Sequence, residues 1–457
     1  MEKEQRINLY INKYKDNEAY MTAFDYCNRN MNLDYGDKLY LYVMLPTLNE
    51  YIRWVLTRAQ NAGIKRLYFL ARDGYQMFLL AKSMVAKYNL EIDCRYLYVS
   101  RYAIRIPEYH LSGEKCLDYI CSGGIDVTFD KIMKRAGLTD EEALTVASGC
   151  GWTKDYERVL NYQEVLNLRK VLAESKKFLP MVYEHSKAAY ANAVGYLEQE
   201  GLMDDVSYAF VDSGWVGTLQ KSIAHLVHSV NKNVRVRGFY FGMYEYPSDV
   251  AVKDYEAYYF TPYDGIKRKV YFSNCLFEAV FSSPGGMTTG YTKDNEVNGL
   301  YSPKFDLPNN PNHVRIERYA EILDKFVQSY NGTFNDRISD KKNNIQVIQS
   351  VLTDFMGKPD TLEADAFGEI LFSDDLLEKH MQNVSADLST KEIKKQRFFS
   401  KVLIMTGIKK DTIHESAWIE GSIVRNGVQI KSNLWHAHLY KYFVYIRKRL
   451  QQGRKRR

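Results

Sequence analysis

Residues 67–78 of this 457-residue chain read LYFLARDGYQMF. The first five form a short apolar run, and an amphipathic pattern begins after Gly74. A short apolar run that stops at charged residues and a glycine, just before a helical pattern, is typical of a buried strand leading into a helix. We therefore predict a strand at 67–71 and a helix at 75–88.

The same alternation recurs further along the chain. Strands rich in Tyr, Phe and Val are expected at 94–100, 207–212, 234–242 and 255–260, and helices at 36–63, 215–230 and 270–282. Strands that alternate with helices favour an α/β fold with a parallel, doubly wound sheet. Such sheets bind ligands at the carboxyl ends of their strands, so the residues that follow each strand are the first candidates for a site.

Between the two groups of strands the pattern is helical, which predicts an insertion. An apolar content of 46% is enough for a large core. The predicted organisation begins with an N-terminal helical segment at 1–63 and the first half of the α/β core at 64–111. A helical insertion or cap at 112–205 and the second half of the core at 206–300 follow. The C-terminal region at 301–457 is expected to be mostly helical, with a polar loop at 301–313 and a basic tail at 447–457.

Composition narrows the possible settings of the protein. The sequence has no apolar run long enough to cross a membrane, its charged N-terminus does not resemble a signal peptide, and its six cysteines show no zinc-binding spacing. We therefore expect a cytoplasmic protein with reduced thiols. The net charge of +6 comes from the tail RKRLQQGRKRR, which carries seven cations and leaves about −1 for the rest. This tail is either a contact with the inner face of the plasma membrane or a solvated, frayed terminus. No nucleic-acid-recognition motif accompanies it, so no nucleic-acid partner is expected.

The loop in FVDSGWVGTLQ (210–220) is the strongest site signal. Asp212 ends the predicted strand, and Gly214 and Gly217 allow a tight turn and close approach of a ligand. Thr218 either caps the following helix or donates to an anion, and the free N–H groups at a helix start bind phosphate. The spacing fits neither the Walker A loop nor the Gly-x-Gly-x-x-Gly dinucleotide loop. The alternative is an ordinary tight turn with a capping threonine.

The ARDG turn (71–74) resembles the first strand end of haloacid-dehalogenase-type phosphatases, which reads Asp-x-Asp-Gly. Ala71 occupies the position of their nucleophilic aspartate and cannot form a phosphoaspartyl intermediate. The other residues of the turn still suit a ligand site: Arg72 could bind an anion, and Gly74 would let a ligand approach the backbone closely. Asp73 is a carboxylate whose pKa the neighbouring arginine should lower. The alternative is an Arg–Asp pair that only ties a surface turn together.

Two further polar residues follow predicted elements of the core. If the first two strands are neighbours, Arg101 after VS (99–100) lies at the same rim as Arg72, and two guanidinium groups suit a diphosphate. Glu278, in FEAVFSSP (277–284), is either a second carboxylate at the site or a solvated helix residue.

Together, YFLARDGY, YVSR, FVDSGWVGTLQ and FEAVFSSP resemble, in this order, the phosphoribosyltransferase-like modules of bacterial surface-polysaccharide clusters. The resemblance covers roughly residues 40–290. Such modules transfer ribose 5-phosphate from phosphoribosyl diphosphate (PRPP) to a glycan or lipid-linked oligosaccharide, and a separate dehalogenase-type phosphatase then removes the 5-phosphate. Type I phosphoribosyltransferases carry two acidic residues before their PRPP loop, whereas this chain has only Asp212 there, and its loop is shorter.

The resemblance implies a type I-like fold and roles for the strand-end residues. Two separated anion sites would bind the two ends of PRPP. The 210–220 loop would bind the 5-phosphate, and the ARDG turn together with Arg101 would bind the diphosphate. Mg²⁺ would arrive on the donor, with Asp73 or Asp212 as its possible ligands. Asp212 would bind the ribose hydroxyls, Asp73 or Glu278 would act as general base, and the product would be a β-ribofuranoside. Trp215 or tyrosines would stack on the acceptor sugar. The expected catalytic residues are Asp73, Asp212 and Glu278, and the expected binding residues are Arg72, Gly74, Tyr75, Ser100, Arg101, Ser213, Gly214, Trp215, Gly217, Thr218 and Gln220. The alternatives are a phosphohydrolase and a non-catalytic sugar-phosphate-binding module.

Overall fold

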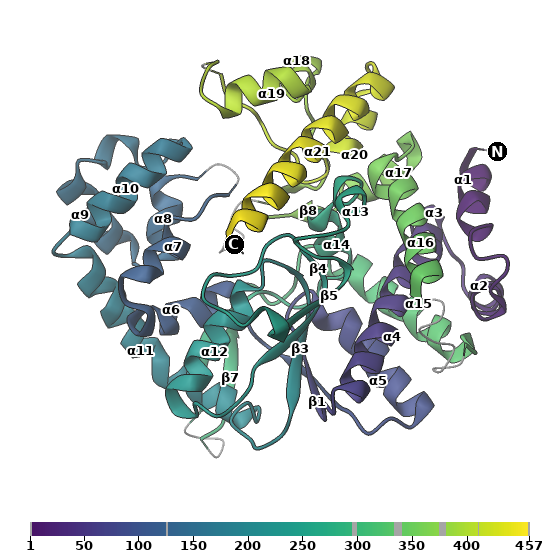
Figure 1. Cartoon of the computed structure of the whole chain (residues 1–457), viewed down its shortest axis with the longest axis horizontal. Coiled ribbons are helices and arrows are strands. Elements are labelled where there is room, and N and C mark those ends of the chain that lie inside the picture. The colour runs from purple at the N-terminus through teal and green to yellow at the C-terminus, as the bar shows by residue number, and fades with distance from the viewer. Residues whose placement is uncertain are drawn as a thin grey trace.

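The computed structural model describes residues 2–124, 127–294, 299–332, 341–373, 381–409 and 411–455. Its centre is a parallel sheet of five strands in the order β2-β1-β3-β4-β5, with helices on both faces (Figure 1). The strands are β1 (Arg66–Leu70), β2 (Asp93–Leu97), β3 (Tyr208–Trp215), β4 (Arg237–Met243) and β5 (Tyr255–Phe260). The prediction of an α/β fold with a parallel sheet is confirmed.

Strand β1 shows why this sheet is covered on both sides. All five of its residues are buried, as expected for a central parallel strand. Successive side chains of a strand point to opposite faces, and accordingly Leu67 and Phe69 join one hydrophobic core while Tyr68 and Leu70 join another.

The first of these cores lies under the N-terminal and C-terminal segments of the chain. It includes Tyr40, whose ring stacks on Tyr319 with centroids 4.1 Å apart, so segments distant in sequence share this face. The elements on this side are α1 (Glu2–Ile11), α2 (Glu18–Asn30), α3 (Tyr35–Leu39), α4 (Leu45–Asn61), α5 (Gly74–Tyr88), α15 (His313–Ser329), α16 (Lys341–Leu352) and α17 (Thr361–Gly368).

The predicted helix at 36–63 is interrupted by a π-turn at Tyr40–Met44, directly before Pro46. Proline has no N–H to donate to the preceding turn, and a local change of hydrogen-bond spacing accommodates it.

The opposite face of the sheet is covered by α6 (Arg101–Ser112), α11 (Phe178–Gln199) and α12 (Thr218–Val230). Between α6 and α11, the described elements are all helical and form a core of their own, which lies to one side of the sheet (Figure 1). These are the 3₁₀ turns Gly113–Cys116 and Thr153–Asp155 and the helices α7 (Leu117–Ile120), α8 (Phe129–Arg135), α9 (Asp140–Cys150) and α10 (Tyr162–Glu174).

Several predicted boundaries after residue 210 are wrong. The helix predicted at 270–282 is two short helices, α13 (Ile266–Val270) and α14 (Asn274–Val280), because the Ser273 hydroxyl starts a new helix by accepting the Leu276 N–H at 3.2 Å. The polar loop predicted at 301–313 begins instead with β7 (Tyr301–Phe305), which pairs antiparallel with β6 (Thr288–Lys293).

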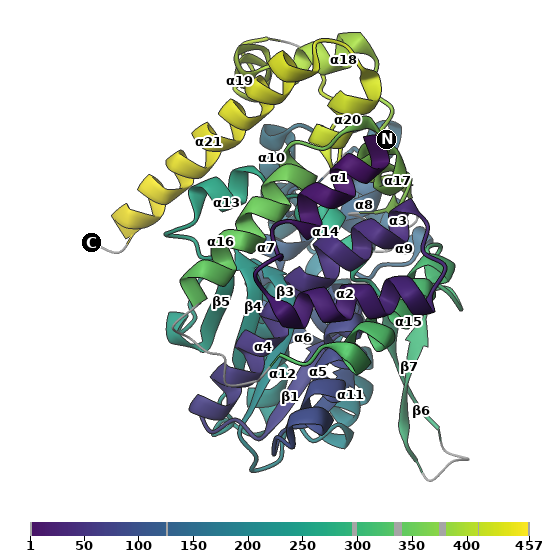
Figure 2. The same ribbon diagram turned by 90° about the vertical axis from the view of Figure 1, so that its right-hand side faces the viewer.

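The remaining C-terminal elements form a layer above the carboxyl ends of the strands. They are the short strands β8 (Leu371–Phe372) and β9 (Gln382–Asn383) and the helices α18 (Thr390–Lys395), α19 (Phe398–Met405), α20 (Ile419–Asn426) and α21 (Ile430–Lys455). The last turns of α21 extend away from the rest of the protein (Figure 2). Within the described parts of the chain, no helix is long and apolar enough to cross a membrane.

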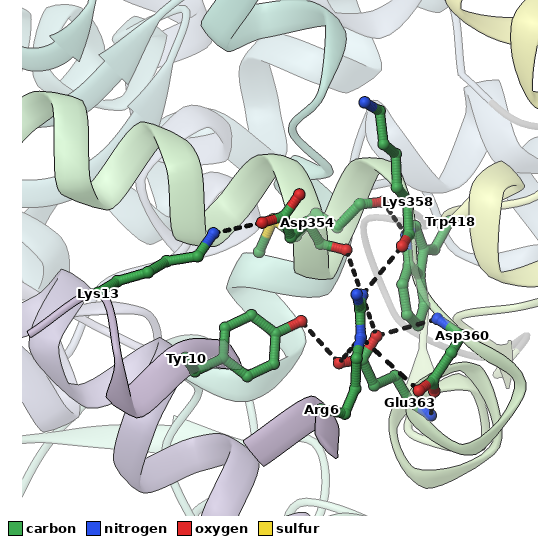
Figure 3. A network of polar contacts seen from close by, with 9 residues as sticks. Arg6, Tyr10, Lys13, Asp354, Lys358, Asp360, Glu363 and Trp418 are labelled. Carbon is green, nitrogen blue, oxygen red and sulfur yellow. Dashed lines mark hydrogen bonds and ion pairs between the residues drawn. The ribbon is translucent and has the colours of Figure 1, made fainter. Parts of the chain in front are cut away.

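Helix α1 is fixed to the C-terminal region by a buried polar network (Figure 3). The Arg6 guanidinium donates to both carboxylate oxygens of Glu363, at 2.9 and 2.7 Å, and the Tyr10 hydroxyl donates to one of them at 2.6 Å. Lys13 contacts Asp354 nearby. Bidentate, charge-assisted bonds of this kind are among the stronger polar contacts in proteins, so helix α1 is held firmly against α17.

Candidate functional site

A cavity of about 220 Å³ lies at the carboxyl ends of the central strands. From β1 the chain turns outward to β2 and later returns on the other side of β1 as β3. Adjacent strands whose connections leave in opposite directions open a crevice between them, which is where open α/β sheets bind ligands. The cavity is lined there by the turns after β1 and β2, the end of β3, the start of α12, and Glu278 on α14.

Asp73 belongs to this cavity instead of capping α5. Although it occupies the N-cap position, its side chain makes no capping bond. Its carboxylate accepts a hydrogen bond from the buried Ser213 hydroxyl of β3. The contact joins the turn after β1 to the neighbouring strand, and the peptide bond between Ala71 and Arg72 in this turn is cis.

Glu278 is also a cavity residue, and the alternative of a solvated helix position is wrong. Its carboxylate accepts a hydrogen bond from the Trp215 indole N–H. The Trp215 ring lies among Tyr244, Phe272 and Phe277, with centroids 5.5–6.0 Å away. Packed in this way, Trp215 holds Glu278 in place, which differs from the predicted role of stacking on an acceptor sugar.

The three carboxylates share one poorly solvated space. Burial, together with the negative charge of Asp73, raises the pKa of Asp212 to about 8 and that of Glu278 to about 8. Burial also raises the pKa of Asp73, although Ser213, Arg72 and Arg101 oppose the rise. Arg72 does lower the pKa of Asp73, as predicted, but the loss of water has the larger effect, so the net shift of the Asp73 pKa is upward.

Arginines from two strand ends meet these carboxylates. β1 and β2 are hydrogen-bonded neighbours, which is the condition under which Arg72 and Arg101 were expected to lie at one rim. Arg72 and Arg101 both line the cavity. Ser100 lies beside them, where its hydroxyl caps α6 by accepting the Ala103 N–H at 3.0 Å and donates to the Thr288 carbonyl at 2.6 Å. This cap fixes the rim of the cavity.

The loop after β3 differs from its predicted form. β3 continues past Asp212, because Gly214 and Trp215 still pair with Gly242 and Met243 of β4. At Gly214, φ is +109°, and a Cβ would lie 2.6 Å from the Gly242 carbonyl oxygen, so only glycine fits. Trp215 also has a positive φ of 71°, an unfavourable backbone conformation of a kind that concentrates at functional sites.

Helix α12 starts at this loop with free N–H groups. Gly217, with φ of +68°, occupies the N-cap position and no side chain caps the helix. Of the two roles offered for Thr218, the capping role is therefore wrong, and donation to an anion stays a prediction. Gly214, Gly217 and Thr218 line the cavity with Ser213, and the uncapped N-terminus presents N–H donors to it.

Sequence reasoning missed a third arginine, Arg105. It is buried, its Nη2 donates to the Thr218 hydroxyl at 2.6 Å, and its guanidinium lies 4.2 Å from the centre of the Tyr119 ring. Burial and the nearby Arg101 lower the pKa of Arg105 to about 10. Among the described residues it has no ion-pair partner. The four-residue spacing from Arg101 on one helix was the signal that could have revealed it.

Three predicted binding residues lie outside the cavity lining. Gly74 is buried where a Cβ would meet the main chain of Phe69 at 2.8 Å, so it serves helix–strand packing. The Tyr75 ring contacts Tyr96. Gln220 is buried, donates to the carbonyls of Val236 and Asp254 at 3.2 Å and accepts from Tyr240, so it links α12 to β4 and to the residue that precedes β5.

The C-terminal region supplies a wall that the sequence did not predict. Asn310 donates to the Ser282 hydroxyl at 3.1 Å. Asn312 exchanges hydrogen bonds with the main chain of Leu371, at 2.8 and 3.1 Å. These four residues line the cavity, and no motif in the sequence links them to the strand ends. Residues 301–457 therefore contribute to the site.

The cations, N–H donors and carboxylates at this site fit an anionic ligand and proton transfer. In the described part of the chain, no group of three or more His, Cys, Asp or Glu side chains is arranged to hold a metal ion. No family model matches the sequence, and a comparison with curated protein sequences finds no match.

Proposed function

We propose that the protein is a PRPP-dependent transferase that moves ribose 5-phosphate to a hydroxyl of a glycan or lipid-linked oligosaccharide. The observation that carries the proposal is the convergence, in one cavity at the strand ends, of cationic and N–H donors on two loops together with three carboxylates. PRPP has an anion at each end of one sugar and requires such a pair of sites. A type I phosphoribosyltransferase-like character of the fold is part of this proposal.

The loop after β3 would bind the 5-phosphate. The uncapped N-terminus of α12 offers N–H groups, and the Thr218 hydroxyl can donate its proton to the phosphate while it accepts from Arg105. Arg105 adds positive charge from behind, in a buried position where electrostatic interactions are weakly screened. A buried guanidinium without a carboxylate partner in the described chain favours an anionic ligand.

Arg72 and Arg101 would bind the departing diphosphate. Their guanidinium groups suit phosphate oxygens, and Mg²⁺ would enter as part of the donor, with Asp73 as the nearest candidate carboxylate. As the bond between the anomeric carbon and the diphosphate breaks, positive charge develops on the sugar ring. Asp212 lines the same cavity as the two proposed anion sites, and it would bind the ribose hydroxyls and stabilise that charge.

Glu278 is the proposed general base. It would accept the proton of the acceptor hydroxyl as that oxygen bonds to the anomeric carbon opposite the diphosphate, giving a β-ribofuranosyl 5-phosphate. A base works best when its pKa lies near the operating pH, and that of Glu278 is raised to about 8. Its hydrogen bond to Trp215 limits its movement, and the positive charge of Arg101 in the same cavity favours its ionised, proton-accepting form.

The proposed partners follow from this reaction. The acceptor would be a sugar hydroxyl of a surface-polysaccharide precursor, the product would pass to a separate phosphatase that removes the 5-phosphate, and the proposed setting is the cytoplasm. Without Asp at position 71, the phosphatase nucleophile of the dehalogenase type is missing, so this chain is not proposed to remove the phosphate itself.

The test is a transfer assay with PRPP, Mg²⁺ and candidate lipid-linked or soluble oligosaccharides, read by the mass of the acceptor. We expect a gain of one phosphoribosyl unit, lost in Asp73→Asn and Asp212→Asn but kept in Asp205→Asn, the same change at an exposed position. Full transfer by both site variants would contradict the assignment of the site. PRPP binding without any diphosphate release would favour a binding module.

A further inference from the structure

Within the described chain, the long C-terminal helix α21 packs against the protein mainly through one side. On that side, Tyr445 stacks on Tyr244 with centroids 5.4 Å apart, and Lys441 and Lys448 pair with Glu420 and Glu245 at 2.6 and 2.5 Å. The opposite side presents large apolar side chains to solvent. We call this side the outer face: Trp435, Phe443, Ile446 and Leu450 are 59%, 42%, 47% and 65% exposed.

The spacing of these four residues makes the outer face a continuous stripe. At 3.6 residues per turn, they fall within about 80° of the helix circumference. The stripe continues onto α19, because the Phe398 ring contacts Phe443 with centroids 5.8 Å apart and the adjacent Phe399 is 71% exposed. A row of exposed Trp, Phe, Ile and Leu on a folded protein marks an interaction surface.

The charges on α21 indicate the partner. The helix contains no Asp or Glu, and the exposed Arg447 and Arg449 flank the stripe, one on each side by the same helical spacing. An apolar stripe between cations is the pattern of a helix that lies in the plane of an anionic bilayer surface. A second copy of this helix would bring cations against cations, which disfavours a dimer through the same face.

We propose that the outer face of α21 docks on an anionic membrane surface, with the aromatic and aliphatic side chains in the headgroup region and Arg447 and Arg449 on the lipid phosphates. The proposal uses residues up to 450. Of the predicted basic tail at 447–457, the side chains of 452–455 and the whole of residues 456 and 457 lie outside the described residues.

The docked helix would bring the cavity close to lipid. Tyr445, on the inner side of α21, stacks on Tyr244, whose ring lies 5.8 Å from that of Trp215, the residue that holds Glu278. A lipid-linked acceptor would then reach Glu278 from the membrane side. Only this last link depends on the proposed function, because docking itself needs no transfer chemistry.

Vesicle cosedimentation of the full chain, without PRPP or acceptor, tests the docking. The probes are vesicles of phosphatidylcholine alone and vesicles of phosphatidylcholine and phosphatidylglycerol in equal amounts. The outer-face variant is Trp435→Ser/Ile446→Ser/Leu450→Ser. Its control removes three other exposed apolar residues, as Leu144→Ser/Val159→Ser/Val314→Ser. All six positions are exposed, so both variants should remain folded.

We expect the full chain to sediment with the anionic vesicles and much less with the neutral ones. The outer-face variant should bind at least about 10-fold more weakly, since each lost apolar group removes buried area, and the control should bind as the unmodified chain does. Equal binding by the outer-face variant would overturn the proposal, as would equal binding to both kinds of vesicle. A concentration-dependent dimer in analytical ultracentrifugation that only the outer-face variant abolishes would overturn it in favour of a second copy. Because the assay contains no donor, failure of the transferase proposal would leave its result unaffected.

Discussion

Replacement of Glu278 by glutamine should make the protein more stable at alkaline pH. Glu278 is half-buried beside Asp73 and Asp212, and the loss of water around it raises its pKa from 4.5 to about 8. The folded state therefore holds this proton more tightly than the unfolded state does. For a raised pKa, the stabilising contribution is complete below the unfolded value near 4.5 and is lost as pH rises through about 8. Glutamine has no charge to bury, and it keeps an oxygen that can accept the Trp215 N–H.

The size of the effect follows from the same pKa. At 1.36 kcal/mol per unit, a rise from 4.5 to about 8 has an upper limit of about 5 kcal/mol. Asp73 and Asp212 take up part of this proton binding, and access of water to the cavity weakens it further. The stability of Glu278→Gln relative to the unmodified protein should therefore rise by about 1–3 kcal/mol between about pH 5 and about pH 9. Near pH 5 the two proteins should differ little, because Glu278 is then mostly protonated in the folded chain.

Urea unfolding followed by far-ultraviolet circular dichroism at the two pH values measures this difference. The matched control is Glu198→Gln at an exposed position, which should change the free energy of unfolding little at either pH. The reasoning would be refuted if Glu278→Gln shifted stability equally at both pH values, or if it made the protein less stable near pH 9.

Three further outcomes are expected. Asp212→Asn should lower the rate of transfer, measured as diphosphate release, by roughly 100- to 10,000-fold. A thermal unfolding curve should show little loss of stability. An unchanged rate would mean that Asp212 takes no part in the reaction. Arg105→Gln should raise the KM for PRPP about 10-fold or more. It should weaken the binding of ribose 5-phosphate, followed by calorimetry, by a similar factor, because both ligands carry the phosphate held near Thr218. An effect on kcat alone would contradict a role of Arg105 in binding the 5-phosphate. Gly214→Ala should lower the free energy of unfolding in urea by about 2 kcal/mol or more, because the new Cβ would lie 2.6 Å from the Gly242 carbonyl oxygen and φ at this position is +109°. An unchanged free energy of unfolding would show that β3 and β4 separate more easily than their pairing suggests.

The sequence was most informative where local physics alone determines structure. The strands β1 and β5 follow from short apolar runs, and the prediction of helices on both sides follows from the amphipathic pattern between them. The pairing of β1 with β2, which brings Arg72 and Arg101 to one rim, follows once the sheet is parallel. Such features depend on residues close in sequence or on a topology with few alternatives.

The sequence was least informative where distant segments meet. β3 was expected to end at Asp212, because Gly214 looks like a turn residue until its pairing with β4 is known. Burial of Asp73 depends on the whole cavity, so its pKa could not be judged from the arginine beside it. The contributions of Arg105, Asn310 and Asn312 arise from packing between elements that no motif connects.

The exposed face of α21 was predictable only in part. Its cations stand out in composition, but a basic tail alone does not distinguish a docking helix from a frayed end. The additional information is that Tyr445 and Lys448 fix the inner side of the helix to the protein, which leaves Trp435 and Leu450 outward.

The central claim is that the cavity activates the diphosphate end of PRPP and leaves the 5-phosphate intact. Phosphorus NMR of PRPP incubated with the protein, Mg²⁺ and lipid-linked oligosaccharide acceptors follows both ends in one sample. We predict that the diphosphate signals of PRPP give way to free diphosphate while a phosphate monoester remains on the glycan, and that Glu278→Gln slows this change. Release of inorganic phosphate from the 5-position, or PRPP that persists unchanged with every acceptor while the protein is folded, would contradict the account.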